Sequence, residues 1–404
     1  MTNKPQPTRP FVQNLDEARG SYPLDLQKVL SRASGAEARR TVSAWEGYTP
    51  TPLVQLDALA TREGVAAIAY KQEAARFGLN SFKALGGAYA ALRLLARLAS
   101  QRSGAPVSEA AILAGDHADF AAGVTLCCAT DGNHGRSVAW GGRMFGCRVV
   151  IFLHADVSQA REDAIRAYGA EIVRTPGNYD DSVRAADKAA AENGWFVVSD
   201  TSYPGYTEVP RDVMQGYAIM VEEAIDALPL PPTHVFIQGG VGGLAAAVTA
   251  TLWEAYGPQA PRIVVVEPET AGCLYESARA GEPVAVHGSL ETIMAGLACG
   301  EPSLIAWPVL HQGADAFMLI TDTDAADTMR LLASGAAGPK LVAGESGVAG
   351  LAGFLALDPA TRAGLGIDAA SRLLVFGSEG DTDPQVFQEI TGRSGDALRA
   401  EGAL

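Results

Sequence analysis

Runs of Val, Ile and Leu alternate with Ala-rich, helix-like stretches along most of the chain. The strand-like runs are VTLCCAT (124–130), CRVVIFL (147–153), AEIVRTP (170–176), WFVVSD (195–200), HVFIQGG (234–240), RIVVVEPE (262–269) and RLLVFGSEG (372–380). The helix-like stretches between them are RSVAWGGRMFG (136–146), SQAREDAIRAYG (158–169), DDSVRAADKAAAENG (180–194) and LAAAVTATLWEAYG (244–257). Continuous apolar strands that alternate with helices predict an α/β protein with open, twisted, mainly parallel sheets flanked by helices.

About ten strand–helix units of this kind are too many for one comfortable sheet, so we expect two α/β domains. The segment ASQRSGAPVSEAAILAGDHADF (99–120) is polar and contains glycine. We interpret it as a long connection between the two domains or as an insertion.

Charge and composition narrow the possible partners. The 404 residues are 48% hydrophobic and 19% charged, which is ordinary for a globular protein, and the formal net charge is −15. Nucleic acids and anionic membranes require a basic face, so we expect neither as a partner. There is no apolar run long enough to span a membrane, and the polar, proline-rich start lacks the apolar centre of a secretory signal. We therefore expect a cytoplasmic protein.

The five cysteines do not form a disulfide framework in a chain of this length. Cys127 and Cys128 lie in an apolar run and are expected in the core. Cys273 and Cys299 could meet in space, but we do not expect them to pair. The six histidines are scattered, without an HExxH or a Cys-x-x-Cys motif, so no metal site is expected.

One lysine stands out in the stretch RFGLNSFKALGG (76–87), where Lys83 lies between apolar residues and two glycines. Burial lowers the pKa of a lysine amine, and the neutral amine is a nucleophile towards an aldehyde. The alternative is a lysine on an exposed helix face, with its methylene groups along the surface.

Two glycine-rich turns follow strands further along the chain. ATDGNHGRSVAW (129–140) places Gly132 and Gly135 between a strand and a helix, at the edge of a parallel sheet where ligands bind. VFIQGGVGGLAAAV (235–248) can direct several backbone N–H groups and a helix N-terminus at a phosphate. The second turn also fits a dinucleotide fingerprint, with Gly240, Gly242 and Ala245 followed by Glu267. For this loop alone, a cofactor phosphate, a dinucleotide and simple packing all remain open.

Pyridoxal phosphate (PLP) combines an aldehyde with a phosphate, so it requires both a buried lysine and a phosphate-binding loop. The segment VFGSEGDTDP (375–384) adds a serine, Ser378, at a strand end. Its hydroxyl can hydrogen-bond a pyridine nitrogen without fixing a full positive charge on it, which favours β-elimination. The alternative is a strand-end turn without a ligand.

Taken together and in this order, SFKALGG, DGNHG, GGVGG and SEGDTDP resemble the tryptophan-synthase-type, or fold type II, PLP enzymes. Within that group RFGLNSFKALGG, ATDGNHGRSVAW, NYDDSVR, DTSYPGYTEVP, MQGY, IMAGLACGEP and EGDTDP resemble the diaminopropionate ammonia-lyase family, from about residue 45 to 384. The resemblance implies β-elimination of 2,3-diaminopropionate, in its D or L form, to pyruvate and ammonia.

For the cofactor, the resemblance implies that Lys83 forms the imine, that Asn133 bonds the phenolic oxygen and that Ser378 faces the ring nitrogen. The phosphate would be held by the loop of Gly239, Gly240, Val241, Gly242 and Gly243. PLP would then lie in a cleft between a large domain (1–104 and 202–404) and a small domain (105–201), and a homodimer is expected.

For the substrate, the resemblance implies contacts with Ser81, Thr130, Asp131 and Gly132. Asp131 and Asp200 would act as acid and base on opposite faces of the α-carbon, one for each enantiomer. Without the resemblance, Asp200 is better explained as a turn or helix cap.

Three alternatives remain at this point: a threonine or serine dehydratase-type PLP lyase, an NAD-dependent dehydrogenase, and a PLP-binding protein without catalytic activity.

Overall fold

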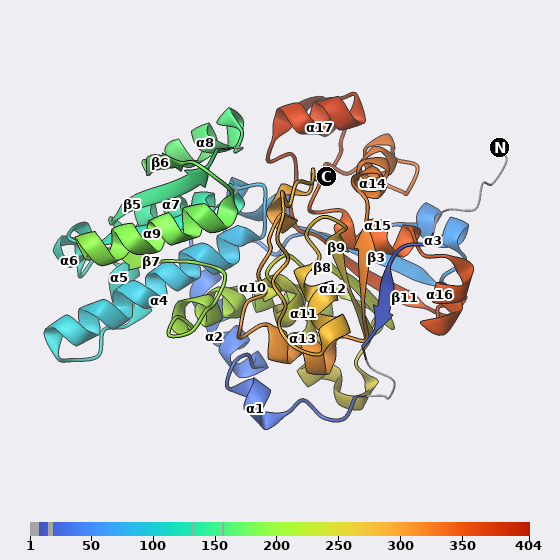
Figure 1. Cartoon of the computed structure of the whole chain (residues 1–404), viewed down its shortest axis with the longest axis horizontal. Helices are drawn as coiled ribbons and strands as arrows, with labels where there is room; N and C mark the ends of the chain where they lie inside the picture. The colour runs from blue at the N-terminus through green and yellow to red at the C-terminus, as the bar shows by residue number, and fades with distance from the viewer. Residues whose placement is uncertain (1–7, 15–18, 131, 156) are drawn as a thin grey trace.

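The computed structural model describes residues 8–14, 19–130, 132–155 and 157–404, which form two units, each built on one sheet (Figure 1). The larger sheet has seven strands, which in spatial order are β1 (Phe11–Gln13), β10 (Ala316–Ile320), β9 (Arg262–Pro268), β8 (His234–Gln238), β11 (Arg372–Gly377), β3 (Ala67–Gln72) and β2 (Leu53–Gln55). Its two edge strands are antiparallel to their neighbours, and the five central strands are parallel.

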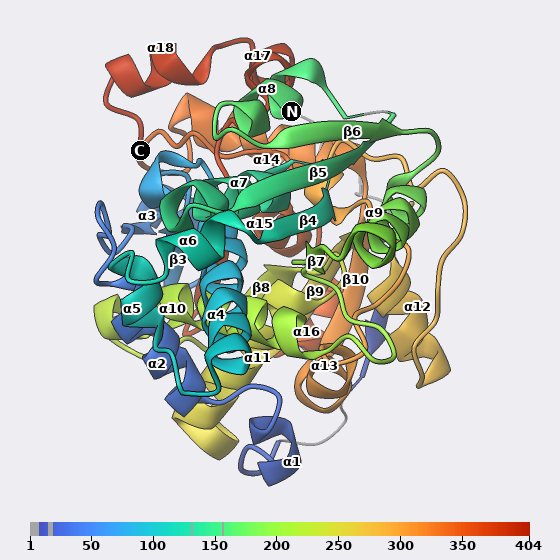
Figure 2. The same cartoon turned by 90° about the vertical axis from the view of Figure 1, so that its left-hand side faces the viewer.

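The smaller sheet is entirely parallel and faces the viewer in Figure 2. Its four strands are, in order, β6 (Glu171–Thr175), β5 (Arg148–His154), β4 (Thr125–Thr130) and β7 (Phe196–Val197). Successive residues of β4 face opposite sides of this sheet. Cys127 packs in a cluster with Ala186 of α9 (Tyr179–Asn193), whereas Cys128 packs in a cluster with Val138 of α7 (Asn133–Phe145). Both cysteines are fully buried, as expected from the sequence.

Helices cover the faces of both sheets. Up to residue 193 they are α1 (Leu24–Gln27), α2 (Arg32–Val42), α3 (Asp57–Glu63), α4 (Lys83–Ser103), α5 (Glu109–Leu113), α6 (Ala118–Ala122), α7 (Asn133–Phe145), α8 (Gln159–Arg166) and α9 (Tyr179–Asn193). Beyond it they are α10 (Glu208–Ala227), α11 (Gly243–Tyr256), α12 (Cys273–Ala280), α13 (Trp307–Gly313), α14 (Asp322–Ser334), α15 (Ala349–Leu355), α16 (Pro359–Gly364), α17 (Pro384–Thr391) and α18 (Gly395–Ala400). Short 3₁₀ turns occur at Arg76–Gly78, Gly257–Gln259 and Ala295–Leu297.

Most expected elements are confirmed, and the differences have physical reasons. The run at 195–200 forms a strand of only two residues, Phe196–Val197. The segment 99–120 is largely helical, because α4 continues to Ser103 and α5 and α6 follow. The prediction did not include β1, β2, β3 or β10. In β3 the apolar run is interrupted by Lys71, which is buried because its ammonium group pairs with Glu223.

The small sheet, at 125–197, falls inside the proposed small domain 105–201, and the domain boundaries stay a prediction. Helix α4 packs against both α7 and α10, so it connects the two units (Figures 1 and 2). No helix in the described ranges combines the length and apolar character needed to cross a membrane.

Candidate active site

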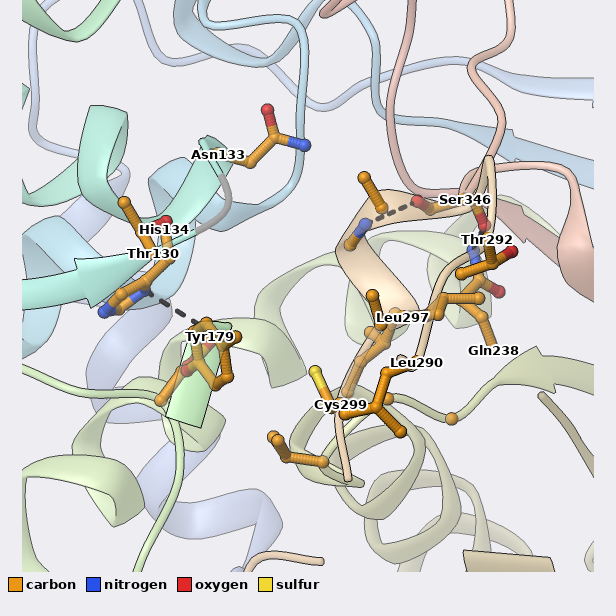
Figure 3. Close-up of a pocket in the computed structure, with 18 of the residues that line it drawn as sticks. Thr130, Asn133, His134, Tyr179, Gln238, Leu290, Thr292, Leu297, Cys299 and Ser346 are labelled. Atoms are coloured by element: carbon orange, nitrogen blue, oxygen red, sulfur yellow. Dashed lines mark hydrogen bonds and ion pairs between the residues drawn. The ribbon is translucent and has the colours of Figure 1, made fainter. Parts of the chain in front are cut away.

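A cavity of about 630 Å³ lies between the two units, where β4, β8 and β11 end. Carboxyl ends of parallel strands are the usual ligand-binding edge of an open α/β sheet. Figure 3 shows Thr130, Asn133, His134 and Tyr179 on one wall and Gln238, Leu297, Cys299 and Ser346 on the other. Among the residues expected from the sequence, the cavity is lined by Lys83, Thr130, Asn133, Asp200, Gly239, Gly240, Val241, Gly243 and Ser378.

Lys83 is the first residue of α4, and its side chain is only 18% exposed. Its amine lies 5.3 Å from the ring centre of Phe82 and 5.8 Å from that of Tyr217, and it forms an ion pair with Asp200. The lysine therefore points into the cavity, and the alternative of an exposed lysine on a helix face is wrong.

Asp200 follows β7 and presents its carboxylate to the same cavity. Burial by itself raises the pKa of this carboxyl, but the charge of Lys83, and then that of His134, outweigh burial and hold the pKa well below its usual range. The imidazole Nδ1 of His134 lies 3.9 Å from the carboxylate, and its Nε2 is 2.8 Å from the carbonyl oxygen of Val198. Asp200 is therefore charged at neutral pH.

The loop between β8 and α11 lines the cavity with Gly239, Gly240, Val241 and Gly243. The N–H groups of Gly239 and Gly242 donate to the carbonyl oxygens of Val266 (2.9 Å) and Gly239 (3.1 Å). Gly240 and Gly242 have φ values of +59° and +99°, which a residue with a side chain rarely adopts. A Cβ built on Gly242 would lie 3.1 Å from Cδ1 of Leu310, so this residue faces the packed side of the loop and not the cavity. The N–H groups at the start of α11 have no partner within the helix, which makes this end suitable for an anion.

Ser378 lies directly after β11, and a backbone hydrogen bond ties it to the residue that precedes Lys83. Its carbonyl oxygen accepts a hydrogen bond of 2.9 Å from the N–H of Phe82, the residue before the lysine. Its hydroxyl oxygen accepts a 2.7 Å bond from the side-chain amide of Gln238, so its own hydrogen can be donated into the cavity. Both Ser378 and Gln238 line the cavity.

Asn133, the first residue of α7, donates a side-chain hydrogen bond to Glu379. The other carboxylate oxygen of Glu379 accepts a 2.9 Å bond from the N–H of Ser346. Asn133 and Glu379 therefore connect the two walls of the cavity.

The residues expected to bind substrate are partly brought together. The hydroxyl of Thr130 accepts hydrogen bonds of 3.0 Å from the N–H groups of Gly132 and Gly135, which shapes the turn after β4. Ser81 is buried and pairs with Glu379 as an isolated bridge, and neither Ser81 nor Gly132 lines the cavity. Asp131 lies outside the described residues.

Glu267, the acidic residue of the dinucleotide fingerprint, has another role. It is fully buried and accepts hydrogen bonds from the N–H groups of Leu274 (3.0 Å) and Tyr275 (2.7 Å) at the start of α12. Burial raises its pKa to about 8, although these two backbone bonds lower it. A Cβ on Gly239 would lie 2.6 Å from Cγ of Glu267, so the side chain packs beneath the loop. It is not available to bind a ribose.

Cys273 and Cys299 are both free thiols. Cys273 is buried, which raises its pKa, whereas Cys299 lines the cavity. Within the described ranges, no three His, Cys, Asp or Glu side chains are grouped so that they could hold a metal ion.

Comparison with known proteins identifies the family. Residues 44–368 match the family model described as "Pyridoxal-phosphate dependent enzyme". The diaminopropionate ammonia-lyase of Escherichia coli is 39% identical to the chain, over 90% of this chain and 92% of the relative. This chain belongs to the diaminopropionate ammonia-lyase family. The family's Salmonella typhimurium member is 40% identical, over 86% of this chain and 89% of the relative.

A crystal structure of the Escherichia coli diaminopropionate ammonia-lyase, in complex with an aminoacrylate–PLP azomethine reaction intermediate, superposes with a TM-score of 0.84. The identity is 37%, and the match covers 95% of this chain and 96% of the other. The predicted fold type II architecture, the PLP cofactor and the diaminopropionate ammonia-lyase family are thereby confirmed.

The residues present fit PLP. The amine of Lys83 and the loop residues Gly239, Gly240, Val241 and Gly243 line one cavity, and the hydroxyl of Ser378 retains a hydrogen to donate there. No lysine or arginine belongs to the loop itself, so a phosphate there would depend on backbone N–H groups and the α11 dipole.

Several cavity residues had no role in the sequence interpretation. They are Gln238, Glu379, Tyr179, Thr292 and Cys299, and His134 also lines the cavity. Gln238 directly precedes GGVGG and Glu379 lies in SEGDTDP, while Tyr179 lies in NYDDSVR and Cys299 in IMAGLACGEP. The resemblance to the diaminopropionate ammonia-lyase family marked these stretches, but position in a motif does not show which side chain faces the cavity.

Proposed function

We propose that this protein converts 2,3-diaminopropionate, in its D or L form, and water into pyruvate and two molecules of ammonia by PLP-dependent β-elimination. The observation that carries the proposal is that Lys83 and Asp200 are paired in the same cavity as the glycine loop and Ser378. The relatives that span most of the chain are named for this activity.

For the cofactor, we propose that Lys83 binds the aldehyde carbon, Asn133 the phenolic oxygen and Ser378 the ring nitrogen. The phosphate would be held by the loop of Gly239, Gly240, Val241, Gly242 and Gly243. The N–H groups of Gly240, Val241 and Gly243 would bond it, because those of Gly239 and Gly242 already donate to the carbonyl oxygens of Val266 and Gly239. When bound, PLP withdraws electrons from the substrate's α-carbon and so makes its hydrogen acidic. The hydrogen bond from the N–H of Phe82 to the carbonyl oxygen of Ser378 supports this arrangement, because it fixes the backbone of Ser378 relative to Lys83.

For proton transfer, we propose that Asp200 accepts the α-hydrogen of one enantiomer and Asp131 that of the other. The depressed pKa of Asp200 supports its role, because the carboxylate is charged and ready to accept a proton at neutral pH. The amine of Lys83 lies beside it and can return a proton to the departing β-amino group. His134 stabilises the same carboxylate, with its Nδ1 3.9 Å away.

For the substrate, we propose that the turn at 130–133 binds the α-carboxylate, with Thr130 at the cavity wall and Gly132 shaping the turn. Ser81 would support this site from the loop before Lys83, through its pairing with Glu379. A carboxylate suits this position, because α7 begins at Asn133, which lines the cavity, and the first N–H groups of a helix have no partner within it.

We also propose that the protein acts as a homodimer in the cytoplasm, with a small amino acid as its only substrate class. Light scattering of the purified protein, at protein concentrations in the nanomolar and in the micromolar range, would test the dimer. A monomer mass at every concentration would contradict it.

The visible spectrum of the purified protein, followed by borohydride reduction and peptide mapping, tests cofactor attachment. The expected result is an imine absorption band and a modified Lys83.

Substrate choice is tested by comparing pyruvate release from D- and L-diaminopropionate, serine and threonine. Faster release from serine or threonine would favour a dehydratase, and a colourless protein that binds NADH would favour a dehydrogenase.

A further inference from the structure

Gln238 is a buried side chain at a point where three segments of the seven-stranded unit meet. It ends β8, directly before the glycine loop, and is only 1% exposed. Its amide nitrogen Nε2 lies 3.0 Å from the carbonyl oxygen of Phe376 on β11 and 3.3 Å from those of Ser346 and Gly347, before α15. Figure 3 shows Gln238 on the same wall of the cavity as Ser346.

These three carbonyl oxygens fix the direction of the Gln238 amide. A carbonyl oxygen can only accept a hydrogen bond, so the amide atom that faces all three of them must be the nitrogen. A reversed amide would place an oxygen against three other oxygens. The buried amide oxygen Oε1 has no hydrogen-bond partner among the described residues, which shows that the contacts of the nitrogen decide the orientation.

The same amide nitrogen sets the hydrogen bonding of Ser378. It donates to the hydroxyl oxygen Oγ of Ser378 over 2.7 Å, the shortest of its four contacts. Ser378 is only 3% exposed and lines the cavity. Within the described ranges its hydroxyl donates no hydrogen bond to the protein, so its hydrogen is left for a group in the cavity.

A ring nitrogen in front of Ser378 would therefore meet a donor. An unprotonated pyridine nitrogen can accept the hydroxyl hydrogen, which completes a chain of donors from Gln238 through Ser378 to the ring. A protonated ring nitrogen would donate to Oγ instead, and the hydroxyl hydrogen would then be buried without an acceptor, which is unfavourable. The amide of Gln238 thus favours the ring without a proton.

We propose that Gln238 is a positioning residue that directs the hydroxyl hydrogen of Ser378 at the pyridine nitrogen of PLP and so keeps that nitrogen unprotonated. The proposal rests on the proposed function, because it assumes that Ser378 faces the ring nitrogen. Protonation of the ring sets how strongly it withdraws electrons, so Gln238 influences the reaction through the cofactor.

The test uses enzyme loaded with PLP that is isotopically labelled at the pyridine nitrogen, because the nitrogen NMR chemical shift reports whether this atom carries a proton. Gln238→Met has a similar length and volume but no donor, so Oγ of Ser378 becomes free to accept from a protonated ring. We expect the apparent pKa of the ring nitrogen to rise by about one unit or more, which is about a tenfold gain in proton affinity.

Matched variants separate this effect from general damage. Gln385→Met is the control, because this glutamine is exposed on α17 and bonds Glu389, and its ring nitrogen is expected to titrate as in wild type. Gln238→Glu keeps the side-chain length, and as a neutral acid it carries one hydrogen where glutamine carries two. The pKa of the ring nitrogen in this variant is expected between those of wild type and Gln238→Met.

A double variant tests whether Gln238 acts through Ser378. Ser378→Ala removes the hydroxyl that connects the amide to the ring, so adding Gln238→Met to it is expected to change the nitrogen titration no further. Turnover gives an independent measurement. The ratio of kcat in Gln238→Met to kcat in wild type is expected to change with pH around the pKa found by NMR, which a purely structural role would not produce.

A ring nitrogen that titrates alike in wild type and Gln238→Met would overturn the proposal, even if PLP content and melting temperature fall. So would a nitrogen that is already protonated in wild type, or an equal effect of Gln238→Met in the Ser378→Ala background. Should Gln238→Met fail to fold, Gln238→Glu decides by the same criteria. A wild-type enzyme that binds PLP at Lys83 but releases no pyruvate refutes the proposed function, and the NMR titration still decides the role of Gln238.

Discussion

Lys83 and Asp200 form an ion pair inside the cavity, although 117 positions separate them in the sequence. Lys83 begins α4, whereas Asp200 follows β7 at the edge of the other sheet. The pair keeps the amine in the cavity and keeps the carboxylate charged in a buried position, where an isolated charge is costly. The nucleophile and the proposed base are therefore positioned by each other before any ligand binds.

Replacement of Lys83 by alanine tests the nucleophile. We expect Lys83→Ala to lose the imine absorption band and to reduce pyruvate release from diaminopropionate by at least about a thousandfold, because no other amine lines the cavity in the described ranges. The control is Lys188→Ala, whose side chain is 76% exposed on α9. Full pyruvate release by Lys83→Ala would show that the site lies elsewhere.

Separate asparagine substitutions test the two proposed bases. If Asp131 and Asp200 serve opposite faces of the α-carbon, Asp131→Asn and Asp200→Asn change the ratio of D to L turnover in opposite directions. Each is expected to slow its own enantiomer by about 10²–10⁴-fold, the usual contribution of a general base. Rates are measured as pyruvate release from each pure enantiomer. Equal, mild losses for both enantiomers would reject the assignment.

Gly242→Ala tests the phosphate loop. Gly242 has a φ of +99°, and an added Cβ would lie 3.1 Å from Leu310 and 3.3 Å from Ala306, so the loop must shift. We expect the dissociation constant for PLP to rise by roughly tenfold, measured by titration of the cofactor-free protein. The control is Gly257→Ala, at the other end of α11, which also has a positive φ (+55°) but has open space around it. Equal PLP affinity in both variants would show that this loop does not hold the phosphate.

The sequence predicted the fold because its strands are continuous apolar runs that end in glycine turns. VTLCCAT, CRVVIFL, HVFIQGG and RIVVVEPE all become strands, and the stretches between them become the expected helices. Strand β10 was missed because AFMLI is a short apolar run, which periodicity alone cannot distinguish from a helix segment. Strand β3 was missed because its Lys71 is buried through a partner, Glu223, more than 150 positions away.

The site could be predicted only where local sequence determines the backbone. Glycine turns after strands mark the ligand edge, so the loops at 132 and 239–243 were found. The hydrogen bond of Arg161 on α8 to Glu345 could not be found in this way, because it depends on the contact of α8 with a segment of the other unit. For Glu267 the sequence suggested a role that the structure does not support. Its spacing matches a ribose-binding acid, yet its side chain accepts hydrogen bonds from the N-terminus of α12.

Glu267→Gln tests this structural role through pH. Burial raises the pKa of Glu267 to about 8, against about 4.3 for an exposed glutamate. Between these values the folded protein holds a proton that the unfolded chain has lost, so the free energy of unfolding of wild type falls as pH rises, by up to about 1.4 kcal/mol per pH unit. Glutamine has no such proton and still offers an acceptor to Tyr275, so the variant is expected to match wild type near pH 5 and to be more stable near pH 8.5. Denaturant unfolding at both pH values measures the difference, with the exposed Glu269→Gln as control. Parallel pH curves for wild type and Glu267→Gln would mean that Glu267 is already ionised in the folded protein, held as a carboxylate by the N–H groups of α12.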